Sequence, residues 1–282
     1  MKKSMYIALL LVLLTIVWTT GCTTRQQTAE TDTLTDSAMI DTLGSDTLET
    51  LIEETPMPKA ADELFDDFIF NFAANKKLQL SRIDFPLATD NFGKTATMQQ
   101  RQWRMERFFM RQGFYTLIAG SQKDLDGSKD TKTEHVIIEK IFLDKNFIQQ
   151  YVFNRVDGLW KMQQVNKQTL RQNVNGDFYS FYSKFSTDSL FRQQSLAESV
   201  DFSGPDPEDD FSRMEGSIMP EQWEMFGPEL PKGMIYNIIY GEDRKISGNQ
   251  RLFVVRGIAN GMETQLTFKK SKDGYQLTKI NM

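Results

Sequence analysis

The chain has 282 residues, a formal net charge of -5, a single histidine and a single cysteine. This acidic balance argues against nucleic acid as a partner, because nucleic-acid-binding domains carry a basic surface. A lone cysteine cannot close an internal disulfide, and one cysteine with one histidine cannot build a Cys/His zinc cluster. The length leaves room for two domains of ordinary size behind a leader.

The first segment has the layout of an export signal. Two lysines precede an almost entirely apolar run from Tyr6 to Val17, and small residues then lead to Cys22. The apolar run is about 12 residues long, whereas a membrane-spanning helix needs about 20. A cleaved signal peptide over residues 1–21 is therefore favoured over a permanent transmembrane helix.

The end of this segment resembles the lipobox of a bacterial lipoprotein signal. Gly21 and Cys22 match that motif, whereas Thr19 stands where leucine is usual. The resemblance implies cleavage before Cys22 and two acyl chains on that residue, which together hold a protein stably on a membrane. We therefore expect a lipid-anchored envelope protein. The sequence after Cys22 lacks the acidic cluster that resembles a surface-export signal, which favours the periplasmic face of the outer membrane and leaves the cell surface open.

Residues 22–59 are expected to form a disordered acidic tether. Thr, Asp, Glu, Ser and Gln dominate this stretch, Asp-Thr-Leu recurs in it, and it contains no aromatic residue. Such a composition buries too little apolar surface to offset its ordering entropy. An amphipathic helix around Leu43, Leu48 and Leu51 is the alternative for part of it.

The rest of the chain repeats its own order of elements, and this repeat is the most informative feature of the sequence. Aromatic residues at helical spacing predict one helix around Phe65–Phe72 and a second around Phe178–Phe185. Each helix is followed by a short extended piece that ends in an apolar-Asp-Phe triplet, at Ile83–Phe85 and at Val200–Phe202. We infer an internal duplication with a joint near residues 171–176.

The repeat continues to the end of each half. A Gln-Trp pair recurs at Trp103 and Trp223, and Pro220 suits the first turn of a short helix at the second site. Asp-Gly hairpin turns end at Gly158 and Gly274. The strands predicted to correspond are 114–119 with 234–240, 134–143 with 250–258, 146–155 with 262–270, and 160–166 with 275–281. Each half therefore reads as a helix, a short strand, a short helix and four strands in an antiparallel meander.

On these residues each half resembles a nuclear-transport-factor-2-like domain of the cystatin-like group. The matching features are the opening aromatic helix, the long paired strands and the closing strand that follows an Asp-Gly turn at Trp160 and Tyr275. The resemblance implies an α+β fold of tandem cones, over residues 60–172 and 176–282, each a helix packed in a curved antiparallel sheet. The whole chain also resembles an uncharacterised Gram-negative lipoprotein family that carries this fold twice.

Few residues have the pattern of a catalytic site. Enzymes that resemble this fold often pair Asp with His inside the cone, which requires His135 to point inward near Asp84. The place of His135 at a strand end beside a polar loop favours exposure instead. Asp84 and Asp201 recur beside aromatic residues, where burial raises a carboxyl pKa and suits a base, although a turn Asp bonded to backbone amides is the simpler interpretation.

Other candidates are weaker. Trp103 and Trp223 are candidate ligand contacts, with core packing as the alternative. Residues 124–130 resemble a calcium loop only in part, because the glycine and the final bidentate glutamate are missing from their positions. We therefore predict no metal and no cofactor.

The sequence predicts a non-catalytic envelope lipoprotein that binds a small ligand or another envelope protein, through the cones or the cleft between them. The alternative is a small-molecule enzyme, of isomerase or hydrolase type, with its site in the first cone. The two differ in the polar content of the cones, because an enzyme needs converging ionisable residues there. The sequence leaves the ligand, the partner and the oligomeric state open.

Overall fold

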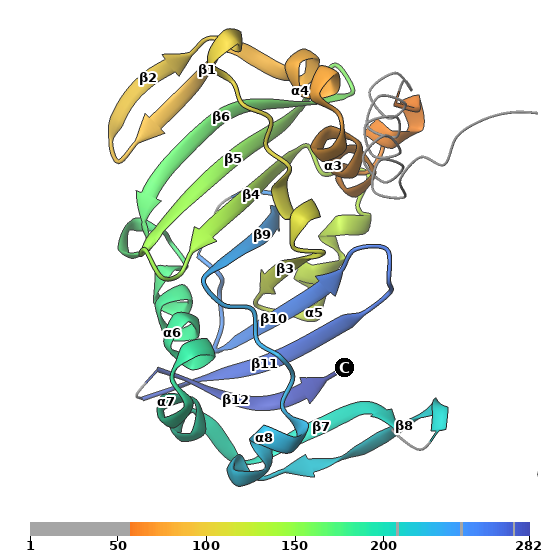
Figure 1. Cartoon of the computed structure of the whole chain (residues 1–282), viewed down its shortest axis with the longest axis vertical. Helices are drawn as coiled ribbons and strands as arrows, with labels where there is room; N and C mark the ends of the chain where they lie inside the picture. Colours follow the sequence, from red (N-terminus) through yellow and green to blue (C-terminus); the bar gives the residue numbers. More distant parts are fainter. Residues whose placement is uncertain (1–56, 207–208, 243–244, 273) are drawn as a thin grey trace, which may run out of the picture. The chain divides into compact units, whose positions relative to one another are not determined.

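One sheet of twelve strands runs through the described part of the chain (Figure 1). The computed structural model describes residues 57–206, 209–242, 245–272 and 274–282. These residues fall in one compact unit, and no helix among them is long and apolar enough to cross a membrane. The predicted signal peptide, Cys22 and nearly all of the predicted tether lie outside the described residues.

The elements of the two halves follow one another in the same order, apart from α5 and η4, which only the first half has among the described residues. The bounds of the predicted long strands lie within about one residue of those observed, except that β6 ends three residues beyond the predicted 160–166. Two strands that the sequence analysis missed, β2 and β8, pair with β1 and β7. The short extended piece predicted after each aromatic helix is wrong, because the helices α4 and α7 lie there and the triplets 83–85 and 200–202 belong to the long strands β1 and β7. The first half contains η1 (Lys59–Asp62), α3 (Phe65–Ala74), α4 (Lys76–Arg82), β1 (Ile83–Asn91), β2 (Lys94–Met98), η2 (Gln100–Gln102), η3 (Phe108–Arg111), β3 (Phe114–Ala119), α5 (Gln122–Leu125), η4 (Asp126–Lys129), β4 (His135–Phe142), β5 (Phe147–Val156), β6 (Leu159–Thr169) and η5 (Leu170–Gln172). The second half contains α6 (Gly176–Thr187), α7 (Ser189–Gln194), β7 (Leu196–Asp206), β8 (Asp209–Ile218), η6 (Pro220–Gln222), α8 (Trp223–Phe226), β9 (Met234–Tyr240), β10 (Gln250–Gly257), β11 (Glu263–Ser271) and β12 (Gly274–Asn281).

The aromatic helices α3 and α6 make matching ring contacts with the sheet. The ring centroids of Phe65 and Phe153 are 5.2 Å apart at an interplanar angle of 67°, and those of Phe178 and Phe268 are 5.5 Å apart at 68°. Edge-on packing of this kind is favourable for aromatic rings. Phe65 and Phe178 therefore lie in equivalent surroundings, as the sequence repeat predicts. The same match holds for Phe65–Trp160 with Phe178–Tyr275, and for Phe72–Phe153 with Phe185–Phe268.

The helices that follow, α4 and α7, begin with the same cap. The side chain of Asn75 accepts a hydrogen bond from Leu78 N at 2.9 Å, and the side chain of Asp188 accepts one from Phe191 N at 3.0 Å. Asn and Asp are favoured at this position because their oxygens satisfy a free N–H of the first turn. The cap ends each aromatic helix and turns the chain toward the sheet.

The third strand of each half is exchanged between the halves. The sheet order is β2-β1-β6-β5-β4-β9-β3-β10-β11-β12-β7-β8. Strand β3 pairs antiparallel with β10, β9 pairs antiparallel with β4, and β3 and β9 are parallel neighbours. The predicted meander of four strands in each half is therefore wrong at its first strand. Alternation shows that a segment is a strand, but it does not identify the neighbouring strand.

The central strands are buried on both faces of the sheet. Val136 and Ile138 of β4 pack with helix α3, whereas Ile141 of the same strand packs with helix α6. Successive side chains of a strand point to opposite faces, so the two helices cover opposite faces of one sheet. We call the two clusters the α3 core, which includes Phe65, Phe68, Phe72, Phe153 and Trp160, and the α6 core, which includes Phe178, Tyr182, Phe185, Phe268 and Tyr275.

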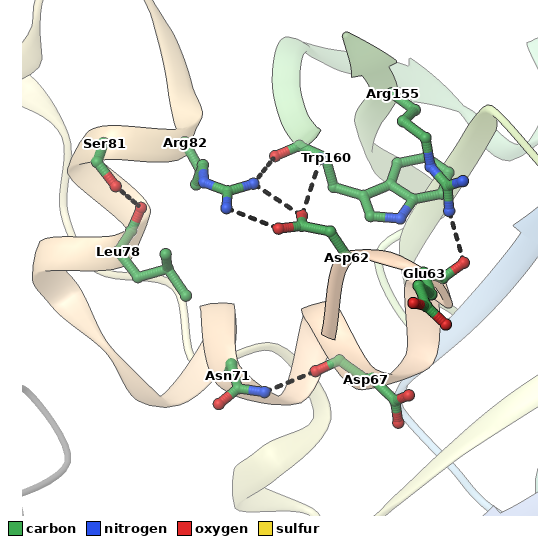
Figure 2. A network of polar contacts seen from close by, with 9 residues as sticks. All are labelled: Asp62, Glu63, Asp67, Asn71, Leu78, Ser81, Arg82, Arg155 and Trp160. Carbon is green, nitrogen blue, oxygen red and sulfur yellow. Dashed lines mark hydrogen bonds and ion pairs between the residues drawn. The ribbon is translucent and has the colours of Figure 1, made fainter. Parts of the chain in front are cut away.

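A buried ion pair joins η1 and α4 to β6 (Figure 2). The carboxylate of Asp62 accepts hydrogen bonds from both terminal nitrogens of Arg82, each at 2.8 Å. Asp62 also accepts from the main-chain N–H of Trp160 at 3.1 Å, and Arg82 donates to the Trp160 carbonyl at 3.1 Å. The two-pronged geometry matches a guanidinium to a carboxylate and is among the stronger polar contacts in proteins.

The hairpin between β5 and β6 has the turn that its sequence predicts. Asp157 and Gly158 both have positive φ, of 52° and 77°. Two-residue turns of this kind suit the twist of paired strands, and Asp-Gly is a preferred sequence for them. The corresponding turn before Gly274 includes position 273, which lies outside the described residues.

Candidate functional site

A cavity of about 850 Å³ lies where the exchanged strands β3 and β9 diverge. The C-terminal ends of both strands line it, together with α5, η4, the segment before β4 and the loop after β9. Its volume falls within the range of about 300–1,000 Å³ that is usual for small-molecule sites. The cavity therefore belongs to both halves, rather than to either cone.

Glu139 is a fully buried carboxylate beside this cavity, in the middle of β4. Its Oε2 accepts hydrogen bonds from Tyr179 Oη at 2.5 Å and from Asn237 Nδ2 at 3.2 Å. Its Oε1 accepts from Asn173 Nδ2 at 2.8 Å and from Gln150 Nε2 at 3.1 Å. A buried carboxylate is tolerated only when such donors replace water. The network ties both halves together and fixes two residues that line the cavity, Tyr179 and Asn237.

Asn237 has one atom whose hydrogen-bonding capacity is unused. Its side chain is 1% exposed, and its Oδ1 is buried with no hydrogen-bond partner among the described residues. The Nδ2 of Asn237 donates to Glu139, so the Oδ1 faces away from it. Buried polar atoms are nearly always paired, so this oxygen is an exception within the buried network around Glu139.

Two glycines let the segment between β3 and β4 pack closely against the end of β9 and the loop after it, beside the cavity. A Cβ placed on Gly127 would lie 2.9 Å from the Cβ of Tyr240, and one on Gly120 would lie 2.8 Å from the Cγ2 of Ile246. Glycine alone permits such contact. The rim that results carries charges of both signs, namely Lys123, Lys132 and Lys245 with Asp124, Asp130, Glu134 and Glu242.

His135 lies at the rim of the cavity, half-buried at the start of β4. Its Nδ1 is 2.6 Å from the Oδ1 of Asn154. Asn154 donates to Gln163 at 2.6 Å, and Gln163 donates to Asp84 at 3.0 Å. His135 and Asp84 are thus linked through two carboxamides across the sheet, and the direct Asp–His pair of an enzyme is not formed.

A smaller pocket of about 230 Å³ opens on the α3 core, around Glu106. The Oε2 of Glu106 accepts from Tyr151 Oη at 2.7 Å and lies 3.0 Å from Lys140 Nζ. Its Oε1 accepts from Tyr236 Oη at 3.0 Å and from the main-chain N–H of Phe108 at 3.2 Å. The carboxylate is therefore saturated with donors.

The surroundings of Glu106 set its pKa. Burial by itself raises the pKa, but the hydrogen bond from Tyr151, the charge and hydrogen bond of Lys140 and the hydrogen bond from Tyr236 together lower it below the usual 4.5. Burial and the nearby carboxylate raise the pKa of Tyr151 and of Tyr236. The group is thus an ionised carboxylate held by two neutral phenols, which leaves neither base nor acid poised near neutral pH.

Gln79 places Glu106 by holding its main chain. The Nε2 of Gln79 donates to the Glu106 carbonyl at 2.7 Å, and its Oε1 accepts from Glu106 N at 3.2 Å. The same Oε1 accepts from Trp103 Nε1 at 3.0 Å. Trp103, a candidate ligand contact, is therefore partly buried against the α3 core and lines neither pocket described above.

The other candidate residues are dispersed. Trp223 is 7% exposed and packs edge-on against Phe185 in the α6 core. Asp201 is exposed on β7. Asp84 lies at the start of β1, 3.4 Å from Lys161 Nζ. Of the predicted candidates only His135 lines the large cavity. Within the described residues, no group of three or more metal-binding side chains comes together.

The sequence analysis missed Glu139, Asn237 and Glu106. The first two carry a readable signal, because Glu139 shares a strand face with Ile137 and Ile141 in HVIIEKIF and Asn237 lies inside the largely apolar strand MIYNIIY. A polar side chain at a buried strand position must find partners, so these two positions predict a buried network. Glu106 lies in an irregular segment between η2 and η3, where no periodicity marks it.

Comparisons with known proteins agree on the fold. A family model described as domain of unknown function (DUF4348) matches residues 44–282. The crystal structure of an NTF2-like protein from Bacteroides fragilis NCTC 9343 is 34% identical, with a TM-score of 0.71, and the match covers 80% of this chain and 98% of that chain. No curated protein matches. The α+β fold with a curved sheet is thus NTF2-like.

Proposed function

Because the chain belongs to the DUF4348 family, which carries no assigned activity, we propose a function from its geometry: a lipid-anchored envelope protein that binds a ligand without transforming it. The ligand site is the cavity between β3 and β9. The observation that supports this most is the cavity itself, about 850 Å³ in volume and lined by the C-terminal ends of both exchanged strands, which is within the usual range for small-molecule sites.

The chemistry of the two pockets favours binding over catalysis. Glu106 and its tyrosines have pKa values displaced away from neutrality, in the directions that keep each group in one protonation state. Glu139 is buried behind Tyr179 and Asn237 and accepts hydrogen bonds from four side chains. A general base must be free to take a proton from the substrate, and neither carboxylate has that freedom.

Thermal denaturation of the full-length chain against a library of polar metabolites tests this proposal. A ligand of the native state at 100 times its Kd stabilises by about 2.7 kcal/mol, which corresponds to a rise in Tm of roughly 5–10 °C for a chain of this size. The substitution Ile239→Trp places a large ring in the cavity from its own wall and should abolish the shift. Thr97→Trp, at an exposed position on edge strand β2, is the matched control and should retain it.

Two outcomes would count against ligand binding in the cavity. A compound that shifts the Ile239→Trp variant as much as the wild type binds elsewhere. If no library compound raises the Tm, the result would favour the other form of the proposal, in which the partner is an envelope protein.

An enzyme with its site in the first cone is the second candidate, and the Glu106 pocket is the observation in its favour. This candidate predicts turnover of some library compound by the wild type, with loss of turnover in Glu106→Gln. Turnover that survives this substitution would remove the first cone from consideration.

The anchor is a separate part of the proposal. We propose that Cys22 carries the lipid and that the body faces the periplasm, on the sequence features of the leader alone. Cells fed labelled palmitate should incorporate it into the wild-type chain and not into Cys22→Ala, and the variant should leave the membrane fraction. Label on the variant would place the lipid elsewhere.

A further inference from the structure

The cavity opens between two strands that are neighbours in the sheet but barely paired. Strands β3 and β9 lie side by side in the strand order, yet Thr116 and Asn237 form their single bridge. On their outer sides each strand is fully laddered, β3 with β10 and β9 with β4. Beyond the bridge the two inner edges face each other across the cavity.

The ladder with β10 shows which main-chain groups of β3 face the gap. In an antiparallel pair, residues that exchange both hydrogen bonds alternate with residues whose N–H and C=O point the other way. Ile258 N donates to the Gly113 carbonyl at 2.9 Å, in register with the pair Val254–Leu117. Odd-numbered residues of β3 therefore bond to β10, and the N–H and C=O of Ile118 point toward β9.

The same argument applies to β9. Gly241 N donates to the His135 carbonyl at 2.8 Å, and Leu143 N donates to the Gly233 carbonyl at 2.7 Å. Both bonds continue the register of β9 with β4, so odd-numbered residues of β9 bond to β4. The main-chain groups of the even-numbered residues point toward β3. The N–H of Ile238 belongs to the bridge with Thr116, which leaves the carbonyl of Ile238 and both main-chain groups of Tyr240 beyond the bridge. No bridge joins Ile118 to either of them.

We infer that an extended peptide segment of a partner protein enters this gap and pairs its main chain with Ile118 on one side and with the Ile238 carbonyl and Tyr240 on the other. The inference rests on the proposed function and names its ligand class. Strand addition of this kind draws affinity from main-chain hydrogen bonds, whatever the side chains of the guest. Here the guest has an edge to pair with on both sides.

The charge of the rim fits a main chain better than other ligands. The described residues of the rim include three lysines and four carboxylates, so a strongly charged ligand of either sign meets repulsion there. An uncharged array of alternating donors and acceptors meets none.

Isothermal titration of the full-length chain with the probe acetyl-Val-Thr-Val-Thr-amide tests the inference. Two analogues of the probe carry N-methyl groups, one at the first and third residues and the other at the second and fourth. Alternate residues of an inserted strand pair with opposite edges, so each analogue loses the donors that pair with one edge. We expect the parent to bind and each analogue to bind at least about tenfold more weakly, since a lost pair of hydrogen bonds is worth about one such factor.

Binding should be lost in Ile239→Trp and kept in Thr97→Trp. Hydrogen exchange at the amides of Ile118 and Tyr240 should slow when the parent peptide is present. Absence of binding by the parent, equal binding by either N-methylated analogue, or binding unchanged by Ile239→Trp overturns the inference. If library compounds bind the cavity and depend on Ile239 while the peptide does not bind, the peptide inference fails and the proposed function stands.

Discussion

The α3 core and the α6 core share their packing and differ in the residues that surround it. In each, an aromatic helix lies edge-on against one phenylalanine of the sheet, Phe153 in the first half and Phe268 in the second. A side-chain hydrogen bond to a carbonyl near the end of each aromatic helix also recurs. Gln79 donates to the Phe72 carbonyl at 2.9 Å, and Arg192 donates to the Phe185 carbonyl at 3.0 Å.

The two halves differ in the residues that surround these ring contacts. Counting from Trp103 and Trp223, Glu106 corresponds to Phe226. Counting along β5 and β11 from the shared phenylalanine, Tyr151 corresponds to Leu266. The polar cluster of the first half is therefore replaced by apolar side chains in the second, where Phe226 packs beside the α6 core. Dense ring packing tolerates little change, whereas an outer position accepts either kind of residue if every buried polar group finds a partner.

The largest effect should come from the shared phenylalanines. Phe153→Ala and Phe268→Ala each remove a fully buried ring, which costs about 3–5 kcal/mol in the free energy of unfolding. If the two cores are equivalent, denaturant unfolding of the two variants should give values within about 1 kcal/mol of each other. If one variant loses less than half of the unfolding free energy that the other loses, the two cores are not equivalent.

The Asp62–Arg82 ion pair of the first half should matter more than the Arg192–Glu224 pair of the second. Asp62→Ala leaves the guanidinium of Arg82 without its carboxylate at a site where the two side chains are 7% and 14% exposed, and we expect a loss of about 3 kcal/mol in unfolding free energy. Glu224 of the second half is 84% exposed and lies 3.8 Å from Arg192.

Glu224→Ala is therefore the matched control, with an expected cost below about 1 kcal/mol. The double variant Asp62→Ala with Arg82→Ala should cost less than the sum of the two single changes, because both remove the same contact. Additive costs would show that the pair does not act as a unit.

Glu106→Gln tests the polar cluster that only the first half has. Removing the charge from a site with four donors should cost about 1–3 kcal/mol at pH 7. The pKa of Glu106 is lowered by folding, so its contribution is complete above the unfolded value of 4.5 and is lost as the pH falls through the lower folded value. Unfolding measured between pH 7 and pH 3 should show this loss in the wild type and in Glu224→Gln, but not in Glu106→Gln.

Asp66 should show the opposite sign and a smaller effect. Burial raises its pKa, and the hydrogen bond from Tyr240 offsets this only in part. A carboxyl whose folded pKa is raised favours folding at low pH, and that contribution is lost as the pH rises from 3.8 through the folded value. Asp66→Asn keeps an oxygen that accepts from Tyr240 and removes the titration. The stability difference between this variant and the wild type should therefore change in favour of the variant as the pH rises over that window, and a difference independent of pH would contradict the assignment.

Much of the fold could be predicted from local patterns. Aromatic spacing predicted α3 and α6, alternation predicted the long strands, and the Asp-Gly turn predicted the hairpin at Gly158. These features depend on near neighbours in the chain, where periodicity is a direct consequence of backbone geometry. The candidate site was harder to predict from the sequence, since its main residues come from strands and helices that meet only in the folded chain.

The sequence by itself determined the two aromatic helices, the long strands that correspond between the halves and the hairpin at Gly158, because side-chain periodicity and turn chemistry act over a few residues. Only the tertiary structure decided that β3 and β9 change places, and with that exchange came the cavity between them and the four donors around Glu139. The physical reason is that the edge of a strand bonds equally well to any strand of suitable direction and register, so the choice of neighbour rests on packing across the whole chain.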